Sequence, residues 1–181
     1  MRLETDRLII REWEPRDRDT YAAIVMDPVA RRFYFDIPTR EQVDAMLDRF
    51  IEFYQRDGFG FLPVERKSDG VFLGDVGLIP IGMPLRGSPP VEIGWFLGKQ
   101  YWGQGYAPEA ARAWIDYAFN ELNLPEVVAW TTVTNLPSQR VMQKLGMRTS
   151  PEDDFIHPKA PPGHALGPHV LYRISRPTGS A

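Results

Sequence analysis

The hydrophobic positions in the first third of the chain follow two different periods. Residues 8–10 form a short apolar run, which predicts a strand, whereas residues 15–26 place apolar side chains on one face of a helix. Thr39 and Gln42 form a capping-box pattern before a longer apolar stripe at helical spacing, and Gly58 follows that stripe. This part of the chain therefore predicts one strand and two helices.

Strand-like runs dominate the middle of the chain. Residues 59–66 and 71–79 are separated by a turn sequence and predict an antiparallel hairpin. A further apolar strand is predicted over residues 91–97, and a glycine-rich turn connects it to a helix predicted over residues 108–122. Pro108 suits the first position of that helix, where no backbone N–H is needed.

The last part of the chain repeats the order of strand and helix. Residues 127–133 predict a buried strand, residues 138–145 predict a short helix that Gly146 caps, and residues 169–174 alternate as a closing strand. A proline-rich excursion separates this helix from the closing strand. A closing strand exposed at the sheet edge could pair with a second copy, so the pattern leaves both a homodimer and a monomer open.

The composition fits a single domain over residues 1–181, because 43% hydrophobic and 12% aromatic residues are ample for one core. The chain has 24 acidic and 21 basic side chains, for a net charge of −3, with no long block of one sign. This balance argues against broad binding to nucleic acid or to an anionic membrane. No apolar run approaches the length of about 20 residues that spans a bilayer, and the first residues lack a signal-peptide pattern. We therefore expect a cytoplasmic protein.

The absence of cysteine and the spacing of histidine narrow the chemistry. Without cysteine the chain has no disulfide, no thiolate nucleophile and no cysteine-ligated zinc. The three histidines, His157, His164 and His169, lack metal-ligand spacing, so we expect no metal. Any transfer chemistry must use other side chains.

Gly103 and Gly105 stand at the predicted turn between a strand and a helix. Glycine lets backbone amides approach a ligand closely, and the first N–H groups of a helix lack internal partners, so such a turn can bind a diphosphate. A bare tight turn is the competing interpretation. Two nucleotide motifs are disfavoured: a Walker A loop needs Gly-Lys-Ser/Thr, which is missing, and a dinucleotide fingerprint needs a third glycine where Pro108 stands.

The residues around this turn resemble a known family. Gln100-x-x-Gly103-x-Gly105-x-Ala107 is similar to the acetyl-coenzyme A (acetyl-CoA) signature of the GNAT acetyltransferases, and motifs between residues 92 and 147 resemble the RimJ/RimL-type branch. The resemblance implies an α+β fold with a central, mostly antiparallel and partly splayed sheet flanked by helices. It also implies acetyl transfer from acetyl-CoA to a primary amine. The acetyl-CoA contacts that it implies are Phe96, Leu97, Gln100, Gly103, Gln104, Gly105, Tyr106, Ala107, Asn135 and Ser138.

Acyl transfer to an amine needs a base for the ammonium proton and an acid for the departing thiolate. The candidate base is Glu92, on the strand before the glycine turn, although a glutamate there is also commonly solvated or paired. Many GNAT enzymes use a tyrosine as the acid, but the matching position here is Met142, which has no proton to donate. Ser138 resembles the serine given that role in the RimL-like branch, and a capping serine is the alternative. Asn135 can pair with pantetheine amides or simply form a turn.

The acceptor site is less clear from the sequence. The family resemblance implies that it lies between the first helices and the late excursion. Aromatic residues 33–35 and acidic residues 152–154 are candidate walls, and His157 is a candidate for assisting proton transfer. The alternative places the aromatic residues in the core and the acidic residues in solvent. The candidate acceptor contacts are Phe33, Tyr34, Glu92 and His157.

Two functions from different classes fit these features. The first is direct acetyl transfer in a ternary complex, with a protein N-terminal amine or a small-molecule amine as the acceptor. The second is a catalytically weak acyl-CoA-binding sensor or interaction module, which Met142 at the acid position favours. The acceptor, the oligomeric state and the preferred acyl-chain length stay open.

Overall fold

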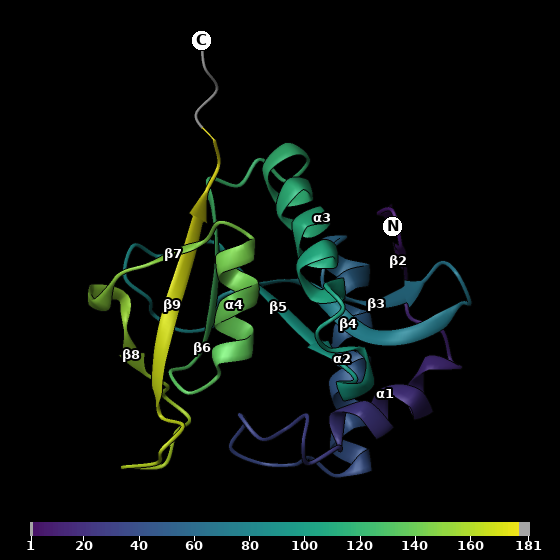
Figure 1. The fold of residues 1–181 in the computed structure, drawn as a ribbon, viewed down its shortest axis with the longest axis horizontal. Helices are drawn as coiled ribbons and strands as arrows, with labels where there is room; N and C mark the ends of the chain where they lie inside the picture. Colours follow the sequence, from purple (N-terminus) through teal and green to yellow (C-terminus); the bar gives the residue numbers. More distant parts are fainter. Residues whose placement is uncertain (1, 178–181) are drawn as a thin grey trace.

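The computed structural model describes residues 2–177, whose strands form one open sheet with helices on both faces (Figure 1). The strand order is β1-β2-β3-β4-β5-β6-β9-β7, and β8 pairs with β9. The strands are β1 (Leu3–Glu4), β2 (Leu8–Ile10), β3 (Phe61–Arg66), β4 (Val71–Pro80), β5 (Val91–Leu97), β6 (Glu126–Thr132), β7 (Arg148–Thr149), β8 (Phe155–Ile156) and β9 (Pro168–Ser175). The helices are α1 (Asp17–Val25), α2 (Arg40–Asp57), α3 (Tyr106–Asn120) and α4 (Leu136–Lys144), with short 3-10 helices η1 (Lys99–Tyr101) and η2 (Pro151–Asp153).

The sheet opens between β5 and β6. These two strands run parallel and pair only at Glu92 and Val128, whereas the other strand pairs in the described part of the chain are antiparallel. Beyond that pair the strands diverge, as Figure 1 shows. We call the diverging halves, residues 93–97 and 129–132, the splay. The predicted fold class, a mostly antiparallel and partly splayed sheet flanked by helices, is confirmed.

Helix α2 has the boundaries that its sequence predicts. The Thr39 hydroxyl accepts a hydrogen bond from the Gln42 backbone N–H, and the Gln42 side chain accepts one from the Thr39 backbone N–H at 2.8 Å. Gly58 ends the helix in a left-handed conformation with φ of 75°. The capping box and the glycine stop are both confirmed, because each satisfies helix-end groups that the helix itself leaves unpaired.

Two later helices begin earlier than the sequence predicts. α3 begins at Tyr106, so Pro108 occupies its third position rather than its first. Gly105, with φ of 84°, already directs the chain into the helix. α4 also begins earlier, because the Asn135 side chain accepts the Ser138 backbone N–H and caps the helix ahead of the predicted start.

The closing strand is not an edge. β9 pairs with β6 along one side and with β7 and β8 along the other. These two short strands lie in segments that the sequence pattern leaves as loops. Because β7 and β8 pair with residues 168–169 and 172–173 of β9, the expectation of an exposed final strand is wrong, while the homodimer and the monomer both stay predictions.

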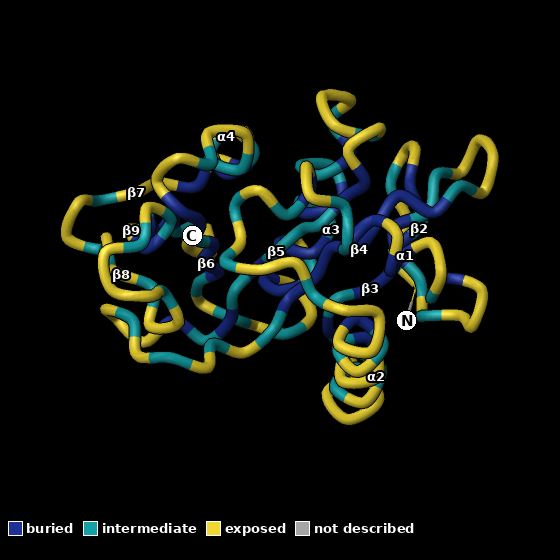
Figure 2. The backbone as a smooth tube through the Cα atoms, turned by 90° about the horizontal axis from the view of Figure 1, so that it is seen from below, coloured by how far each residue is buried: buried dark blue, intermediate teal, exposed yellow. Residues whose placement is uncertain are grey.

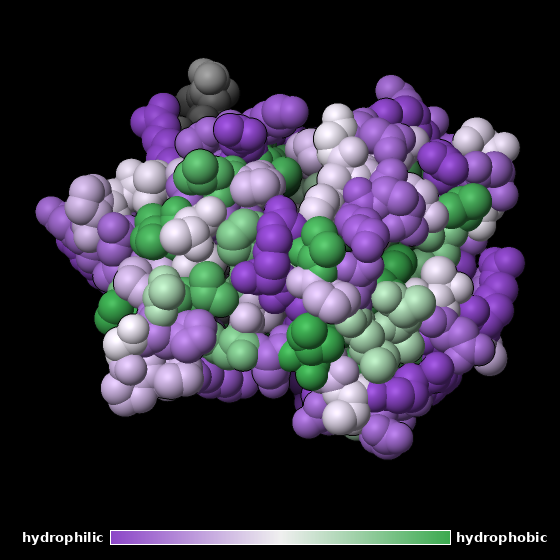
Figure 3. Space-filling model, turned by 60° about the horizontal axis from the view of Figure 1, so that its bottom comes forward, coloured by the Kyte–Doolittle hydropathy of each residue, from purple (hydrophilic) through white to green (hydrophobic). Residues whose placement is uncertain are grey.

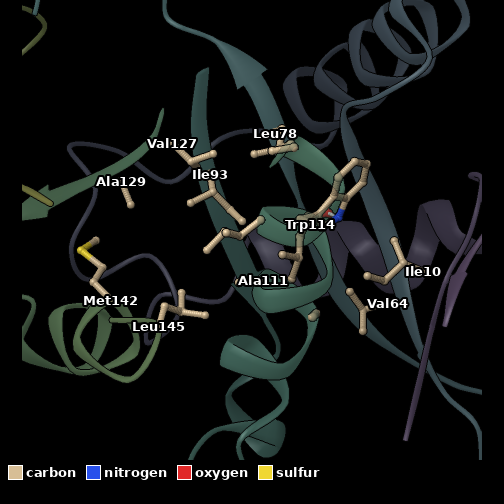
Figure 4. Close-up of a cluster of buried hydrophobic side chains, with 14 of the residues drawn as sticks. Ile10, Val64, Leu78, Ile93, Ala111, Trp114, Val127, Ala129, Met142 and Leu145 are labelled. Atoms are coloured by element: carbon tan, nitrogen blue, oxygen red, sulfur yellow. Dashed lines mark hydrogen bonds between the residues drawn. The ribbon is translucent and has the colours of Figure 1, made fainter. Parts of the chain in front are cut away.

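The main core lies between the sheet and the helices α3 and α4, and Figure 4 shows part of it. Trp114 of α3 is fully buried, and its Nε1 donates to the Val76 carbonyl oxygen at 2.9 Å, which satisfies the one polar group of the ring. Met142 of α4 and Leu145, which directly follows that helix, pack beside Ala129 of β6. This packing holds α3, and with it the glycine turn at its N-terminal end, against the sheet.

Helices α1 and α2 cover part of the opposite face. In Figure 2, α3 and α4 lie on one side of the sheet and α2 on the other. Tyr21 and Val25 of α1 pack with Val43 and Leu47 of α2 and with Phe72 of β4 in a second hydrophobic cluster. Within residues 2–177 no helix combines the length and apolar character needed to cross a bilayer.

Candidate active site

The glycine turn between β5 and α3 has the form of an anion site. Gly103 and Gly105 have φ angles of 75° and 84°, which residues with side chains rarely adopt. Among the described residues, no acceptor pairs with the backbone N–H groups of residues 103–107. These amides lie at the N-terminal end of α3, where the helix dipole favours negative charge. A diphosphate group therefore fits the turn without a lysine.

The other predicted residues of this turn stabilise it. The Gln104 side chain donates to the Gln100 carbonyl oxygen at 2.9 Å, which ties η1 to the turn. The Tyr106 ring is buried in the main core, and its hydroxyl accepts a hydrogen bond from Arg66 at 3.3 Å. Ala107 is half-buried behind it. The side chains thus anchor the turn, while its backbone amides stay available.

The end of β5 offers one backbone N–H to the splay. The Gly98 N–H donates to the Leu73 carbonyl oxygen at 2.9 Å, and the bonding side alternates along an antiparallel strand. Phe96 therefore directs its backbone groups to β4, and Leu97 directs its own toward β6. The Trp102 indole donates to the Leu97 carbonyl oxygen at 2.8 Å, which leaves the Leu97 N–H facing the splay. Of the two β5 residues that were expected to contact acetyl-CoA, Leu97 is therefore the one whose backbone N–H is available to a ligand in the splay.

Glu92 lies at the closed end of the splay, where β5 and β6 still pair. It shares a sheet face with Phe96 and with Asp75 of β4, because cross-strand partners and alternate residues point the same way. The side chain is half-buried overall, but its carboxyl group is shielded from water. This desolvation raises the pKa of Glu92 to about 8. A carboxyl group with a pKa near neutrality is suited to general base catalysis.

Ser138 and Asn135 lie on the other side of the splay. The Trp95 indole of β5 donates to the Ser138 hydroxyl oxygen at 3.1 Å, so this bond joins the two halves of the sheet. The serine oxygen accepts in that bond, which leaves its hydrogen to donate elsewhere. Asn135 is more fully occupied: its oxygen caps α4, and its nitrogen donates to the Thr131 hydroxyl at 2.9 Å. Both bonds of the Asn135 side chain are therefore those expected of a turn residue.

Met142 stands at the position where the resemblance described above implies a tyrosine acid in many proteins. It is 1% exposed and packs in the main core beside Leu145 (Figure 4). Its role is therefore structural, and the nearest donor that the sequence singles out is Ser138 on the first turn of the same helix.

The segment between α1 and α2, residues 27–38, runs beneath the splay in Figure 1, and we call it the aromatic loop. Tyr34 packs edge-on against Phe96 of β5, with ring centroids 5.5 Å apart. The residue is 44% exposed, yet desolvation of its hydroxyl raises the pKa of Tyr34 to about 12; Arg31 opposes this rise, and Asp75 and Glu92 add to it. Phe33 lies apart, 4.5 Å from the Arg32 guanidinium. Tyr34 and Glu92, but not Phe33, therefore come together.

Phe35 connects the aromatic loop to the other half of the sheet. Its ring centroid lies 5.4 Å from those of His157 and His164 and 6.4 Å from that of His169. Burial lowers the pKa of both His157 and His169. His157 thus supports the loop behind Phe35 rather than lying beside Glu92. Because Tyr34 contacts β5 and Phe35 contacts the late excursion, the loop bridges the splay.

Two of the three acidic residues of the late excursion form ion pairs. Glu152 forms an ion pair with Arg86, and Asp153 forms one with Arg173 at 2.8 Å. Neither carboxylate is free for an acceptor ammonium. Within the part of the chain that the structure describes, no three histidine or acidic side chains are placed to hold a metal ion.

Asp75 is a buried carboxyl group that the sequence reasoning missed. It is 2% exposed and lies opposite Phe96 on β4. Burial raises its pKa to about 8, although hydrogen bonds from its own backbone and from Tyr21 act in the other direction. Its Oδ1 has no hydrogen-bond partner among the described residues. The one available signal is an aspartate in the middle of an otherwise apolar strand.

Known proteins are similar to this chain in sequence and fold. Residues 7–148 match the acetyltransferase (GNAT) domain family. The chain is 36% identical over 181 residues to the FsC-acetyl coenzyme A-N(2)-transacetylase of Aspergillus fumigatus, covering 96% of this chain and 76% of that protein. It is 29% identical over 174 residues to the uncharacterized N-acetyltransferase YnaD of Bacillus subtilis, covering 96% of each. A GNAT-family acetyltransferase from Bacillus anthracis has a similar structure, with a TM-score of 0.79, 26% identity and coverage of 97% of this chain and 99% of that one.

Proposed function

The chain belongs to the GNAT acetyltransferase family, and we propose that it transfers the acetyl group of acetyl-CoA to a primary amine by direct attack in a ternary complex. The observation that carries this proposal is the position of a desolvated carboxyl group, Glu92, at the closed end of the splay. The ionised form of this group, which becomes populated as the pH approaches 8, can accept the proton that the acceptor ammonium must lose before its nitrogen attacks.

Each step has a candidate residue. Glu92 takes the proton of the acceptor ammonium, and the neutral amine then attacks the thioester carbonyl. The Leu97 N–H faces the splay and would stabilise the oxyanion that develops. A C–N bond forms, the C–S bond breaks, and the Ser138 hydroxyl gives its proton to the departing thiolate. The new amide nitrogen gives up its surplus proton, which restores the serine hydroxyl, and Glu92 returns its own proton to solvent.

The donor and the acceptor approach from different elements. We assign the diphosphate of acetyl-CoA to the amides of residues 103–107 and the pantetheine arm to the splay, beside Leu97 and Asn135. We assign the acceptor to the face that carries Glu92, with Tyr34 as one wall. The A. fumigatus relative is named for acetyl transfer to N(2), which supports an amine acceptor.

Two observations bear on the class of acceptor amine, and they point to different classes. Motifs between residues 92 and 147 resemble the RimJ/RimL-type branch, which supports the N-terminal amine of a protein. The name of the A. fumigatus relative specifies a numbered nitrogen, N(2), as the acceptor atom, which keeps a small-molecule amine as the alternative. A second function, an acyl-CoA sensor with weak turnover, is favoured only by the buried Met142 at the acid position.

Calorimetric titration with acetyl-CoA, followed by a free-thiol release screen over peptide and small-amine acceptors, tests these assignments. The transferase predicts binding and turnover, and it predicts that Glu92→Gln keeps the binding but loses turnover. Glu52→Gln, on the exposed face of α2, is the matched control. Binding without turnover on the whole panel would favour the sensor, and no binding by the folded protein would refute the acetyl-CoA site.

A further inference from the structure

Arg7 lies beside the glycine turn, and its contacts span that turn. It directly precedes Leu8 of β2, which is fully buried, so the backbone of Arg7 is fixed to the sheet. Its Nη1 donates to the Gln104 carbonyl oxygen at 3.0 Å, on one side of Gly105. Its Nε and Nη2 lie 2.7 Å and 2.6 Å from Oε2 of Glu109, on the other side. One guanidinium thus connects both ends of the turn to the sheet.

The partner of Arg7 is itself held firmly. Glu109 also accepts hydrogen bonds from the Arg7 backbone N–H at 3.0 Å and from the Thr5 hydroxyl. The guanidinium carbon of Arg7 lies 4.6 Å from the centroid of the Tyr106 ring. A Cβ at Gly105 would come within 3.3 Å of Arg7 Nη2, so the guanidinium packs directly on the turn. Two donors of the guanidinium converge on Oε2 of Glu109, while Oε1 accepts the other two bonds, so both carboxylate oxygens are held in place.

The charge of Glu109 gives Arg7 a second effect. Glu109 lies in the first turn of α3, the helix whose N-terminal amides form the anion site. A carboxylate in that position repels a bound diphosphate unless a cation neutralises it. Arg7 supplies that cation at hydrogen-bonding distance. Loss of Arg7 would therefore loosen the turn and leave a negative charge beside it.

We propose that Arg7 is a positioning residue of the acetyl-CoA site, which clamps residues 104–109 and neutralises Glu109 next to the diphosphate. This inference rests on the proposed function of the glycine turn. Arg7 contacts no reacting group, so its loss changes the affinity for acetyl-CoA and leaves the chemical step intact.

The test compares Arg7→Ala, Arg7→Lys and the control Arg2→Ala, whose arginine is exposed and paired with Glu4. For Arg7→Ala we expect the Kd and KM for acetyl-CoA to rise about tenfold, the usual effect of a lost charge-assisted contact, with kcat nearly unchanged. Arg7→Lys keeps the positive charge but lacks the several N–H donors of the guanidinium, so we expect a smaller rise in the Kd and KM for acetyl-CoA. Arg2→Ala behaves as the wild type.

Two further measurements separate a specific role from general destabilisation. S-acetylpantetheine lacks the diphosphate, so its affinity should be the same in the wild type and in Arg7→Lys. The double variant Arg7→Ala, Glu109→Gln should recover part of the lost affinity, because it removes the unpaired charge. Unchanged acetyl-CoA affinity in the folded Arg7 variants, or an equal loss for S-acetylpantetheine, would overturn the proposal. A wild type that binds no acetyl-CoA would instead refute the proposed function on which it rests.

Discussion

Glu92 must lose its own proton before it can accept one from the acceptor. With a pKa of about 8, the carboxyl group is largely protonated at neutral pH and becomes a base only as the pH rises. We therefore expect kcat/KM for the acceptor to rise with pH and to level off above about pH 8. Glu92→Gln should lower kcat by about a hundredfold or more and remove this inflection. Thiol release measured from about pH 6 to about pH 10 checks both.

The acceptor amine also titrates, and Glu92→Gln separates the two ionisations. An inflection that stays near pH 8 in the variant would belong to the acceptor and would exclude Glu92 as the base. Glu52→Gln, on the exposed face of α2, should reproduce the wild-type profile.

The hydroxyl of Ser138 offers the second prediction at this scale. Its oxygen already accepts from the Trp95 indole, so the hydroxyl hydrogen is directed elsewhere. Ser138→Ala should lower kcat by about tenfold or more with little change in the KM for acetyl-CoA, and Ser138→Thr should retain most of the rate. Steady-state kinetics checks the split between kcat and KM. A Ser138→Ala enzyme with wild-type kcat would leave the serine hydroxyl only as the acceptor of the Trp95 indole.

The site residues that the sequence predicts owe their role to the chain close to them, whereas the missed residues owe theirs to partners that are distant in the sequence. Gly103 and Gly105 stand out in the sequence because the backbone itself needs a positive φ there. Trp95 and Arg7 stand out only in the fold, since their partners lie 43 and 102 residues away along the chain. Asp75 was missed for the same reason: its burial comes from elements distant in sequence.

At the scale of elements, the start of α3 depends on Gly105. A residue with a side chain at φ of 84° costs about 1 kcal/mol of the free energy of unfolding. Gly105→Ala should show that loss and should also weaken acetyl-CoA binding, because the turn amides and Arg7 must shift. Gly70→Ala is the matched control: its φ is 69° and a Cβ there meets no atom within 4 Å. Urea unfolding and calorimetry should show equal destabilisation but normal binding in the control.

The start of a helix was predictable where a side chain caps it. It was not predictable where the only signal was a proline, which is tolerated at several positions of the first turn. Thr39 and Gln42 make specific bonds, so the start of α2 follows from the sequence. Pro108 is merely tolerated in a first turn, so it does not mark the start of α3. The short strands β7 and β8 form only because β9 presents its edges to them, and this information is not local.

At the scale of the whole molecule, three kinds of contact connect the two halves of the sheet at the splay. They include the Glu92–Val128 pair, the Trp95–Ser138 bond and the aromatic loop with Tyr34. Figure 3 shows hydrophobic patches between hydrophilic ones at this end of the molecule. Among the described residues, the large hydrophobic side chains that stay exposed include three on the aromatic loop, one after β5, two after β6 and one on β8: Val29, Tyr34, Ile37, Trp102, Val133, Leu136 and Ile156. Part of the exposed apolar surface thus lies on segments that follow β5 and β6, beside the splay where the two substrates are proposed to meet.

The buried acids make the stability of the whole fold depend on pH. The pKa of Asp75 is about 8 in the folded protein and 3.8 in its ordinary state, so the folded state holds this proton more tightly. The resulting stabilisation is complete below about pH 4 and is lost as the pH rises through about 8, and Glu92 acts with the same sign. Asp75→Asn should therefore flatten the fall in the free energy of unfolding over this window, by on the order of a few kcal/mol.

Urea denaturation at a series of pH values measures this effect, with Asp116→Asn on the exposed face of α3 as the control. The double variant Asp75→Asn, Glu92→Gln should be flatter still, because it removes both raised pKa values. If the free energy of unfolding of Asp75→Asn depends on pH as it does in the wild type, a partner must stabilise the ionised form of Asp75 in the folded protein. If the dependence of the free energy of unfolding on pH flattens as expected, Glu92 becomes a base in the same pH range in which the fold loses stability. Catalysis and stability then both depend on the desolvated carboxyl groups of one face of the sheet.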